Sequence, residues 1–267
     1  MSLAAGELLA RVADIARRAA AEILEVYAAG EAAATLKSDR SPLTTADLRA
    51  HRLIVAALGE LTPGVPVLSE EAAHSDYAER SQWQRYWLVD PLDGTREFLS
   101  RNGQFTVNIA LIEAHAPVLG VVHVPVGDTS YRGLAGSLAW RQAGSAPPEQ
   151  IRVAARAAAP VRVVGSRSHR GDSLDAFLAR LGPHELVPVG SSLKFCMVAE
   201  GAADIYPRLG PTSEWDTAAA HAVVSGAGGT VSRLDGRPLE YNTGESLINP
   251  FFAVYGPKDR DWLALLR

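Results

Sequence analysis

Two aspartates three residues apart, Asp90 and Asp93, follow the apolar run 86–89, which has the composition of a buried strand. Pro91 lies between them, and because proline has no N–H to donate, we expect it to end the strand and set a turn. The two carboxylates would then lie just past the carboxyl end of a strand, where open α/β folds bind their ligands. They repel each other unless a cation lies between them, and oxygen-only ligands suit a hard cation such as Mg²⁺.

The next two residues, Gly94 and Thr95, are suited to an anion. Asp93 or Thr95 can cap a helix that starts here, and Gly94 lets an anion approach the backbone N–H groups. Cation ligands and an anion site within six residues indicate phosphate chemistry. The DxxD pattern by itself is more often an acidic turn with an ordinary N-cap, so the rest of the chain has to decide.

Three further carboxylates stand at the ends of predicted elements. Glu70 follows the short apolar strand 65–68, which repeats the geometry expected at Asp90. Asp216 opens an apolar helix, and Asp47 lies in the first turn of a helix predicted after Thr44 and Thr45. Helix capping is the favoured explanation of Asp47, and an offset to the helix dipole also explains Asp216. Two strands that each deliver a carboxylate nevertheless favour a shared cation site, and Asp216 is the third carboxylate that a two-metal cluster needs.

Basic residues gather in the second half, where predicted strands at 161–164, 184–189 and 204–206 alternate with helices. Serine-rich loops follow the first two of these strands, and such loops can hold an anion with N–H, hydroxyl and cationic groups. A single basic residue of this kind is usually a solvated surface charge. Four of them near the strand ends of one layer favour an anion site: Arg167, His169, Lys194 and Arg208.

The composition limits the class of protein. The 267 residues allow one large domain or two halves with a substantial core. A net charge of −4 gives no electrostatic case for binding a nucleic-acid polymer, but it leaves room for a small anionic substrate. Cys196 is the only cysteine, which favours a reducing cytoplasm. No apolar run reaches the roughly 18 residues of a membrane span, and the N-terminal segment does not resemble a signal peptide.

The hydrophobic periodicity predicts helices laid over a largely antiparallel sheet, followed by a smaller α/β layer. The boundary is expected in the proline-containing stretch 144–149, which gives domains 1–148 and 149–267. The first half is expected to hold helices at 3–29 and after 44–45, a hairpin at 105–112 and 118–124, and strands at 129–132 and 138–140.

Three separated motifs together resemble the inositol monophosphatase superfamily: VLSEE at 67–71, DPLDGT at 90–95 and WDTAA at 215–219. The resemblance extends from the first helix to about Phe252. Within the superfamily, the chain is more similar to the bacterial CysQ-type 3′(2′),5′-bisphosphate nucleotidases, through the segments 96–98, 101–103, 166–169, 190–195 and 206–208. Inositol phosphatases usually have Thr-Asn where this chain has Arg96-Glu97. The nucleotidases more often have lysine at position 96, and Arg96 keeps its positive charge.

The resemblance implies an α+β, layered αβαβα sugar-phosphatase fold, with a mainly antiparallel sheet domain beside a smaller α/β domain. It implies a lithium-sensitive phosphatase that uses two or three Mg²⁺ to hydrolyse 3′-phosphoadenosine 5′-phosphate to AMP, linked to sulfate assimilation, with the phosphosulfate as a second candidate substrate. The first alternative is an inositol monophosphatase or a broad sugar-phosphate phosphatase, and the remote one is a non-catalytic nucleotide or metal sensor. A Ser/His hydrolase is disfavoured because no nucleophile-elbow pattern accompanies Ser166, His169 and Asp172.

By the same resemblance, one Mg²⁺ is held by Glu70, Asp90 and the carbonyl of Leu92. A second is held by Asp90, Asp93 and Asp216, and a third, weaker ion would attach near Glu70. The reaction is an in-line attack of water on phosphorus without a covalent intermediate.

The resemblance also assigns the remaining roles. Thr95 and Glu70 would orient and deprotonate the attacking water, with Asp47 accepting a hydrogen bond from Thr95. The substrate would be held at Asp93, Gly94, Thr95, His169, Ser191, Lys194, Arg208 and Asp216. Of these, Ser191, Lys194 and Arg208 would hold the phosphate that is not transferred, and His169 would lie near the adenosine. A monomer is favoured over a homodimer, and peripheral attachment to the inner membrane is left open.

Overall fold

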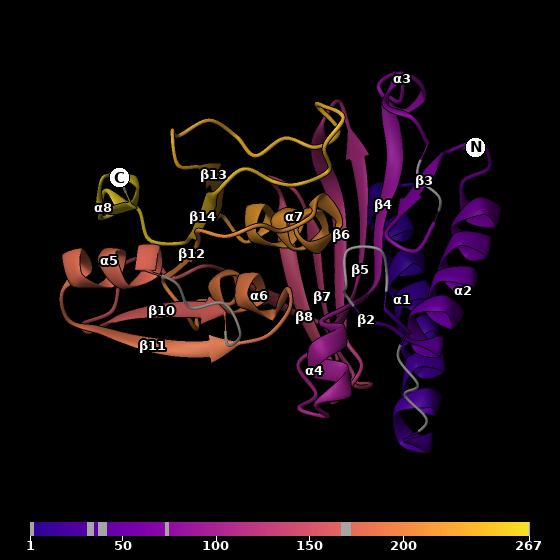
Figure 1. Ribbon diagram of the computed structural model, residues 1–267, viewed down its shortest axis with the longest axis horizontal. Coiled ribbons are helices and arrows are strands. Elements are labelled where there is room, and N and C mark those ends of the chain that lie inside the picture. Colours follow the sequence, from indigo (N-terminus) through magenta and orange to yellow (C-terminus); the bar gives the residue numbers. More distant parts are fainter. Residues whose placement is uncertain (1–2, 31–34, 37–41, 73–74, 167–171, 267) are drawn as a thin grey trace.

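The computed structural model describes residues 3–30, 35–36, 42–72, 75–166 and 172–266. Helices and sheets alternate in layers, and the two sheets are seen nearly edge-on in Figure 1. The larger sheet is covered on one face by α1 (Ala5–Ala29) and α2 (Thr45–Leu61), while α6 (Leu193–Ala199) and α7 (Ala218–Gly226) lie between the sheets, and α5 (Asp172–Leu181) and α8 (Trp262–Leu266) flank the smaller sheet. Buried hydrophobic clusters fill the spaces between these layers. The predicted αβαβα arrangement is confirmed.

The larger sheet has seven strands in the order β3-β4-β5-β6-β7-β8-β9. All neighbouring pairs are antiparallel except β3 and β4, and the predicted hairpin is the pair β5 and β6. The strand β9 lies just past the expected domain boundary and still pairs with β8, so the sheet extends into the second predicted domain. The strands are β3 (Val67–Ser69), β4 (Arg85–Asp93), β5 (Thr106–Glu113), β6 (Ala116–Val124), β7 (Thr129–Leu134), β8 (Leu138–Ala143) and β9 (Glu149–Ile151).

The smaller sheet has five strands in the order β11-β10-β12-β14-β13, with parallel pairing of β10 to β11 and β12 and antiparallel pairing elsewhere. It is therefore a mixed sheet. Its strands are β10 (Val161–Ser166), β11 (His184–Val189), β12 (Ile205–Arg208), β13 (Thr230–Arg233) and β14 (Phe252–Tyr255), and the remaining short elements of the chain are β1 (Thr35–Leu36), β2 (Pro42–Leu43), α3 (Tyr77–Arg80), α4 (Thr95–Leu99) and the 3₁₀ helix η1 (Glu214–Asp216).

Two helix ends in the first layer follow the sequence closely. Gly30 adopts a left-handed conformation with φ of 70° and ends α1, as predicted. Thr44 and Asp47 form a capping box at the start of α2, which confirms the capping explanation of Asp47. No helix in the described ranges is long and apolar enough to cross a membrane.

The helix α7 packs so closely on the larger sheet that its neighbours must be small. A side chain at Gly120 of β6 would collide with the carbonyl oxygen of Ala219, and one at Gly133 of β7 would collide with the backbone of Val223. The alanine-rich sequence of α7 provides the matching surface on the helix side. This contact fixes η1, which immediately precedes α7, against the larger sheet.

The prediction that Pro91 ends its strand is wrong. β4 continues to Asp93, and its pairing with β5 shifts register between Asp90 and Asp93. The irregularity leaves Pro91 outside the regular hydrogen-bond ladder, so its missing N–H costs the sheet nothing. Asp90 and Asp93 therefore lie among the last four residues of a largely buried strand and not in a loop beyond it.

His123 of β6 gives the folded chain a specific dependence on pH. It is 1% exposed, its Nδ1 lies 2.8 Å from the Ser130 hydroxyl, and burial lowers its pKa from 6.5 to about 4, against the opposing charge of Asp128. Between pH 6.5 and 4 the unfolded chain therefore binds a proton that the folded chain does not. We expect the free energy of unfolding to fall by about 2 kcal/mol from pH 7 to pH 5 on account of this residue alone.

Urea unfolding of the wild type and of His123→Gln at the two pH values measures this contribution. The variant should be less stable at pH 7 but should lose about 2 kcal/mol less than the wild type on moving to pH 5. An equal loss in both proteins would show that the His123 pKa is not depressed by folding.

Candidate active site

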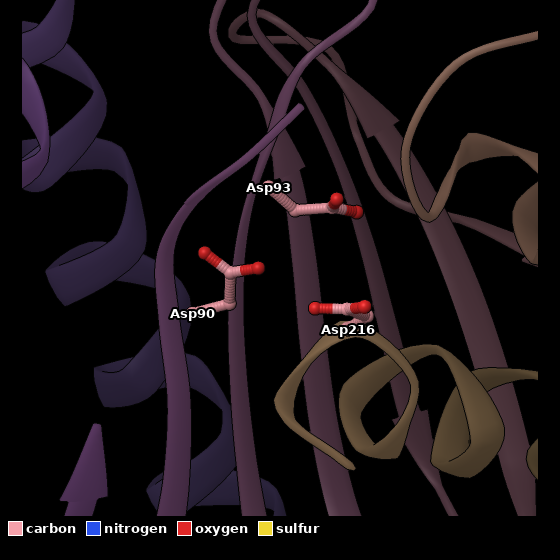
Figure 2. A group of neighbouring side chains, drawn as sticks. All are labelled: Asp90, Asp93 and Asp216. Carbon is pink, nitrogen blue, oxygen red and sulfur yellow. The ribbon is translucent and has the colours of Figure 1, made fainter. Parts of the chain in front are cut away.

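Three aspartates from separate parts of the chain converge at one point. Asp90 and Asp93 come from β4 of the larger sheet, and Asp216 comes from η1. One carboxylate oxygen from each lies within 4.8 Å of the others, and Figure 2 shows the three side chains directed into a common space. The structure thus brings together the two acidic motifs that the sequence analysis treated as parts of one site.

Each carboxylate is held by a backbone N–H through one of its two oxygens. The N–H of Leu92 donates to Asp90 Oδ1 at 3.0 Å, which the irregularity in β4 makes possible. The N–H of Ser192 donates to Asp93 Oδ2 at 2.6 Å, and the N–H of Ser213 donates to Asp216 Oδ2 at 2.9 Å. The second oxygen of each carboxylate receives none of these three bonds.

The electrostatics of the cluster favour a cation. Burial and then the neighbouring carboxylates, with Glu70 among them, raise the pKa values of Asp90 and Asp216 well above the ordinary range. Burial also raises the pKa of Asp93, against the opposing charge of Lys194. One buried and two partly buried carboxylates destabilise one another's charge, and all three offer only oxygen as a ligand atom. This combination fits a hard divalent cation such as Mg²⁺.

Asp47 connects the start of α2 to the start of α4. It is 1% exposed, and its Oδ2 accepts hydrogen bonds from the N–H and hydroxyl of Thr44. Its other oxygen, Oδ1, accepts from the hydroxyl of Thr95 at 3.5 Å. The same carboxylate therefore caps a helix and reaches Thr95, which is the pair that the family resemblance predicts.

The prediction that Asp93 or Thr95 caps a helix is wrong. The N-cap of α4 is Gly94, with φ of 92° and no side-chain cap, and Thr95 is the first helical residue. A Cβ at Gly94 would lie 3.2 Å from the carbonyl oxygen of Gln104 and 3.3 Å from the Cβ of Ser191. Both the left-handed backbone and the close approach of the Ser191 loop therefore require glycine, and Asp93 is free to bond across to Ser192.

The acidic cluster opens into a pocket of about 380 Å³ that also contains the predicted phosphate clamp. Lys194 is 7% exposed, its Nζ donates to the carbonyl of Ser191 at 2.6 Å, and burial lowers its pKa to about 8. Arg208 lines the same pocket, with its Nε donating to the carbonyl of Gly210 at 3.1 Å. Asp93, Gly94, Thr95, Ser191 and Asp216 complete the predicted residues in its lining, whereas His169 and Arg167 lie outside the described residues.

Two residues of this region were missed by the sequence analysis. Asn108 of β5 and Ser192, just before α6, are 1% and 2% exposed and are hydrogen-bonded to each other at 2.9 Å. Asn108 interrupts the apolar run 107–112, and since a buried polar side chain needs partners, this was the one available signal. Ser192 carries no such signal.

Comparison with known proteins identifies the class of this fold and site. A family model described as the inositol monophosphatase family matches residues 6–262. The chain belongs to the inositol monophosphatase family, as its motifs indicate.

Within this family, the chain is similar to bisphosphate nucleotidases. The 3′(2′),5′-bisphosphate nucleotidase CysQ of Salmonella typhimurium is 50% identical over 248 residues, which cover 92% of this chain and 99% of that protein. The crystal structure of CysQ from Bacteroides thetaiotaomicron has a TM-score of 0.83 at 41% identity, and the match covers 97% of this chain and 100% of that one. An inositol monophosphatase from Anabaena shares the fold, with a TM-score of 0.73 at 24% identity over 98% of this chain and 94% of that one.

Proposed function

We propose that this protein is a Mg²⁺-dependent phosphatase that hydrolyses 3′-phosphoadenosine 5′-phosphate to AMP and phosphate. The observation that carries the proposal is that one pocket joins an acidic cluster to Lys194 and Arg208. A monophosphate needs only the acidic cluster, whereas a substrate with a second phosphate also needs the two cations. The names and about 50% identity of the bisphosphate nucleotidase relatives support the same substrate class. The corresponding phosphosulfate is a second candidate substrate.

The cation site would consist of Asp90, Asp93 and Asp216, completed by Glu70 and the carbonyl of Leu92. Each of the three aspartates uses one oxygen to accept a backbone N–H, and the other oxygen would bind the ion. Bound Mg²⁺ supplies charge stabilisation at the phosphoryl oxygens and lowers the pKa of a water.

Thr95 and Asp47 would orient the attacking water. The Thr95 hydroxyl has one proton and two acceptors at 3.5 Å, Asp47 Oδ1 and the carbonyl of Leu92. With the Leu92 carbonyl on the cation, the proton would go to Asp47 and the lone pairs of Thr95 would accept from a water. Asp47 cannot turn away because Thr44 holds its other oxygen. Glu70, beside Asp90, would accept the proton that the water loses on attack.

The loop before α6 would hold the second phosphate. The Ser191 Oγ is buried and has no hydrogen-bond partner in the described part of the chain. Ser191 also has a left-handed backbone with φ of 46°, an uncommon conformation for a residue other than glycine. A phosphate oxygen would supply the missing partner, and Lys194 and Arg208 would offset its charge.

The rim of the pocket offers an apolar surface for a base. Ile248 lines the pocket and is 54% exposed. It is held in place because the segment 247–249 is hydrogen-bonded to 212–214, with the N–H of Glu214 donating to the carbonyl of Leu247 at 2.8 Å. A nucleotide could place its base against this side chain, whereas an inositol phosphate has no apolar group to place there.

Phosphate release from 3′-phosphoadenosine 5′-phosphate and from inositol 1-phosphate, measured side by side with Mg²⁺, tests the proposal. We expect strong preference for the nucleotide and inhibition by lithium. Preference for the inositol ester would retain the cation site and overturn the assignment of the basic loop. No release from either substrate would overturn the enzyme assignment itself and favour a sensor. We extend the proposal to a cytoplasmic monomer, with which the free, buried Cys196 is compatible.

A further inference from the structure

We propose that Asn108 and Ser192 are positioning residues that hold Asp93 and Asp216 together as a preassembled pair for a divalent cation. The inference rests on the proposed function in assuming that such a cation binds at the acidic cluster. It assigns a role in the affinity for the ion to two uncharged residues that belong neither to the acidic cluster nor to the lining of the pocket.

Ser192 joins the two aspartates directly, in addition to the packing of α7 that places η1 against the larger sheet. Asp93 belongs to the larger sheet, and Asp216 belongs to η1 in the second half of the chain. The N–H of Ser192 donates to Asp93 Oδ2 at 2.6 Å, and its hydroxyl donates to the backbone carbonyl of Asp216 at 2.6 Å. Both distances are at the short end of the hydrogen-bond range. One residue thus fixes the two aspartates relative to each other.

Asn108 orients the Ser192 hydroxyl. The only proton of that hydroxyl is used on Asp216, so its oxygen must act as an acceptor toward Asn108. The Asn108 Nδ2 donates to the Ser192 Oγ at 2.9 Å and approaches Asp93 Oδ2 at 3.4 Å, while its Oδ1 accepts from the Thr106 hydroxyl at 3.0 Å. The order of donors therefore runs in one direction, from Thr106 through Asn108 and Ser192 to Asp216.

The chemistry of Asn108 suits a role in the acidic cluster better than a role in the core. It is flanked by the fully buried Val107 and Ile109, and an apolar residue would avoid the cost of burying an amide. An aspartate here would add a further like charge to the cluster, and a lysine would compete with the cation. A neutral amide can donate to Ser192 and Asp93 without doing either.

Holding the pair together matters because its members repel each other until a cation arrives. Oxygens of Asp93 and Asp216 lie within 4.8 Å of each other, and both residues are partly buried. Without Ser192 and Asn108, the packing of α7 would still place η1 beside the sheet, but the two carboxylates would be free to move apart and the ion would have to bring them together. Partners that orient metal ligands in this way typically change metal affinity by about 10- to 100-fold when they are replaced.

Calorimetric titration of metal-free protein with MgCl₂ tests the inference without using turnover. We expect Asn108→Ala and Ser192→Ala each to weaken Mg²⁺ binding by about 10-fold. The double variant should lose less than the product of the two, because the residues act in one chain of hydrogen bonds. Thr106→Val removes only the first donor at nearly constant volume, and a smaller loss in the same direction is expected, which keeps the test available if the alanine variants fold poorly.

Ser130→Ala is the matched control, since Ser130 is a serine of equal burial whose hydroxyl lies 2.8 Å from His123. It should lower the free energy of unfolding without changing Mg²⁺ affinity. Wild-type affinity in folded Asn108→Ala and Ser192→Ala, or a loss no larger than that of Ser130→Ala, would overturn the inference while leaving the proposed function intact. Absence of Mg²⁺ binding by the wild type would overturn both.

Discussion

Asp93→Asn is expected to reduce Mg²⁺-dependent phosphate release by about 1000-fold or more while the fold is retained. The asparagine has nearly the same volume, and its amide oxygen can still accept the N–H of Ser192 that now reaches Asp93 Oδ2. The change removes one of the three charges that would hold the cation. The loss therefore falls on charge stabilisation of the reacting phosphoryl group, which metal ions supply at several kcal/mol.

The same substitution should not destabilise the metal-free protein at pH 7. Burial raises the pKa of Asp93 in the folded state, and a carboxyl with a raised folded-state pKa loses stability as the pH rises from its unfolded value through its folded one. Removing the charge removes that loss, so the urea midpoint without metal should be equal to or higher than that of the wild type. Lower activity with equal or higher stability is typical of a functional site.

Phosphate release over a Mg²⁺ titration, together with urea unfolding, measures both effects. The control is Asp235→Asn, at an exposed aspartate whose carboxylate lies 2.6 Å from the guanidinium of Arg237. This substitution should leave turnover unchanged. Turnover by Asp93→Asn equal to that of the control would exclude Asp93 from the cation site.

Local features of the fold could be predicted from the sequence, and features that depend on a partner strand could not. The apolar spacing and Gly30 place the first helix, and the Thr44–Asp47 pair places the start of the second, because helix ends are determined by a few neighbouring residues. The course of the chain at Pro91 could not be predicted, because the shift in register that accommodates the proline exists only in the pairing of β4 with β5.

The candidate site divides in the same way. The residue types of the two acidic motifs could be read locally, but their meeting depends on the packing of α7 against the larger sheet. The hydrogen bond from Ser192 to Asp93 joins residues 99 positions apart, and no local pattern at Ser192 announces it. Asn108 was detectable only as a polar residue in an apolar strand, a signal that does not say which partner it serves.

Lys194→Ala should raise KM for 3′-phosphoadenosine 5′-phosphate by about 10- to 100-fold and change kcat far less. The Lys194 Nζ is buried in the pocket and is oriented by the Ser191 carbonyl, so it would meet a phosphate that does not react. Hydrogen bonds to charged groups contribute about 1.5–3 kcal/mol, and contacts to a non-reacting group are made equally in the ground and transition states. Such a contact affects binding and not the chemical step.

The matched comparison uses a substrate that lacks the second phosphate. With adenosine 3′-phosphate, wild type and Lys194→Ala should have similar KM values, and Lys258→Ala, at an exposed lysine, should match the wild type with both substrates. The charge of Lys194 also opposes the rise in the pKa of Asp93, so the assay is made at saturating Mg²⁺, where the cation keeps that carboxylate ionised. A loss in kcat as large as the rise in KM, under those conditions, would place Lys194 in the chemical step and contradict its assignment to the clamp.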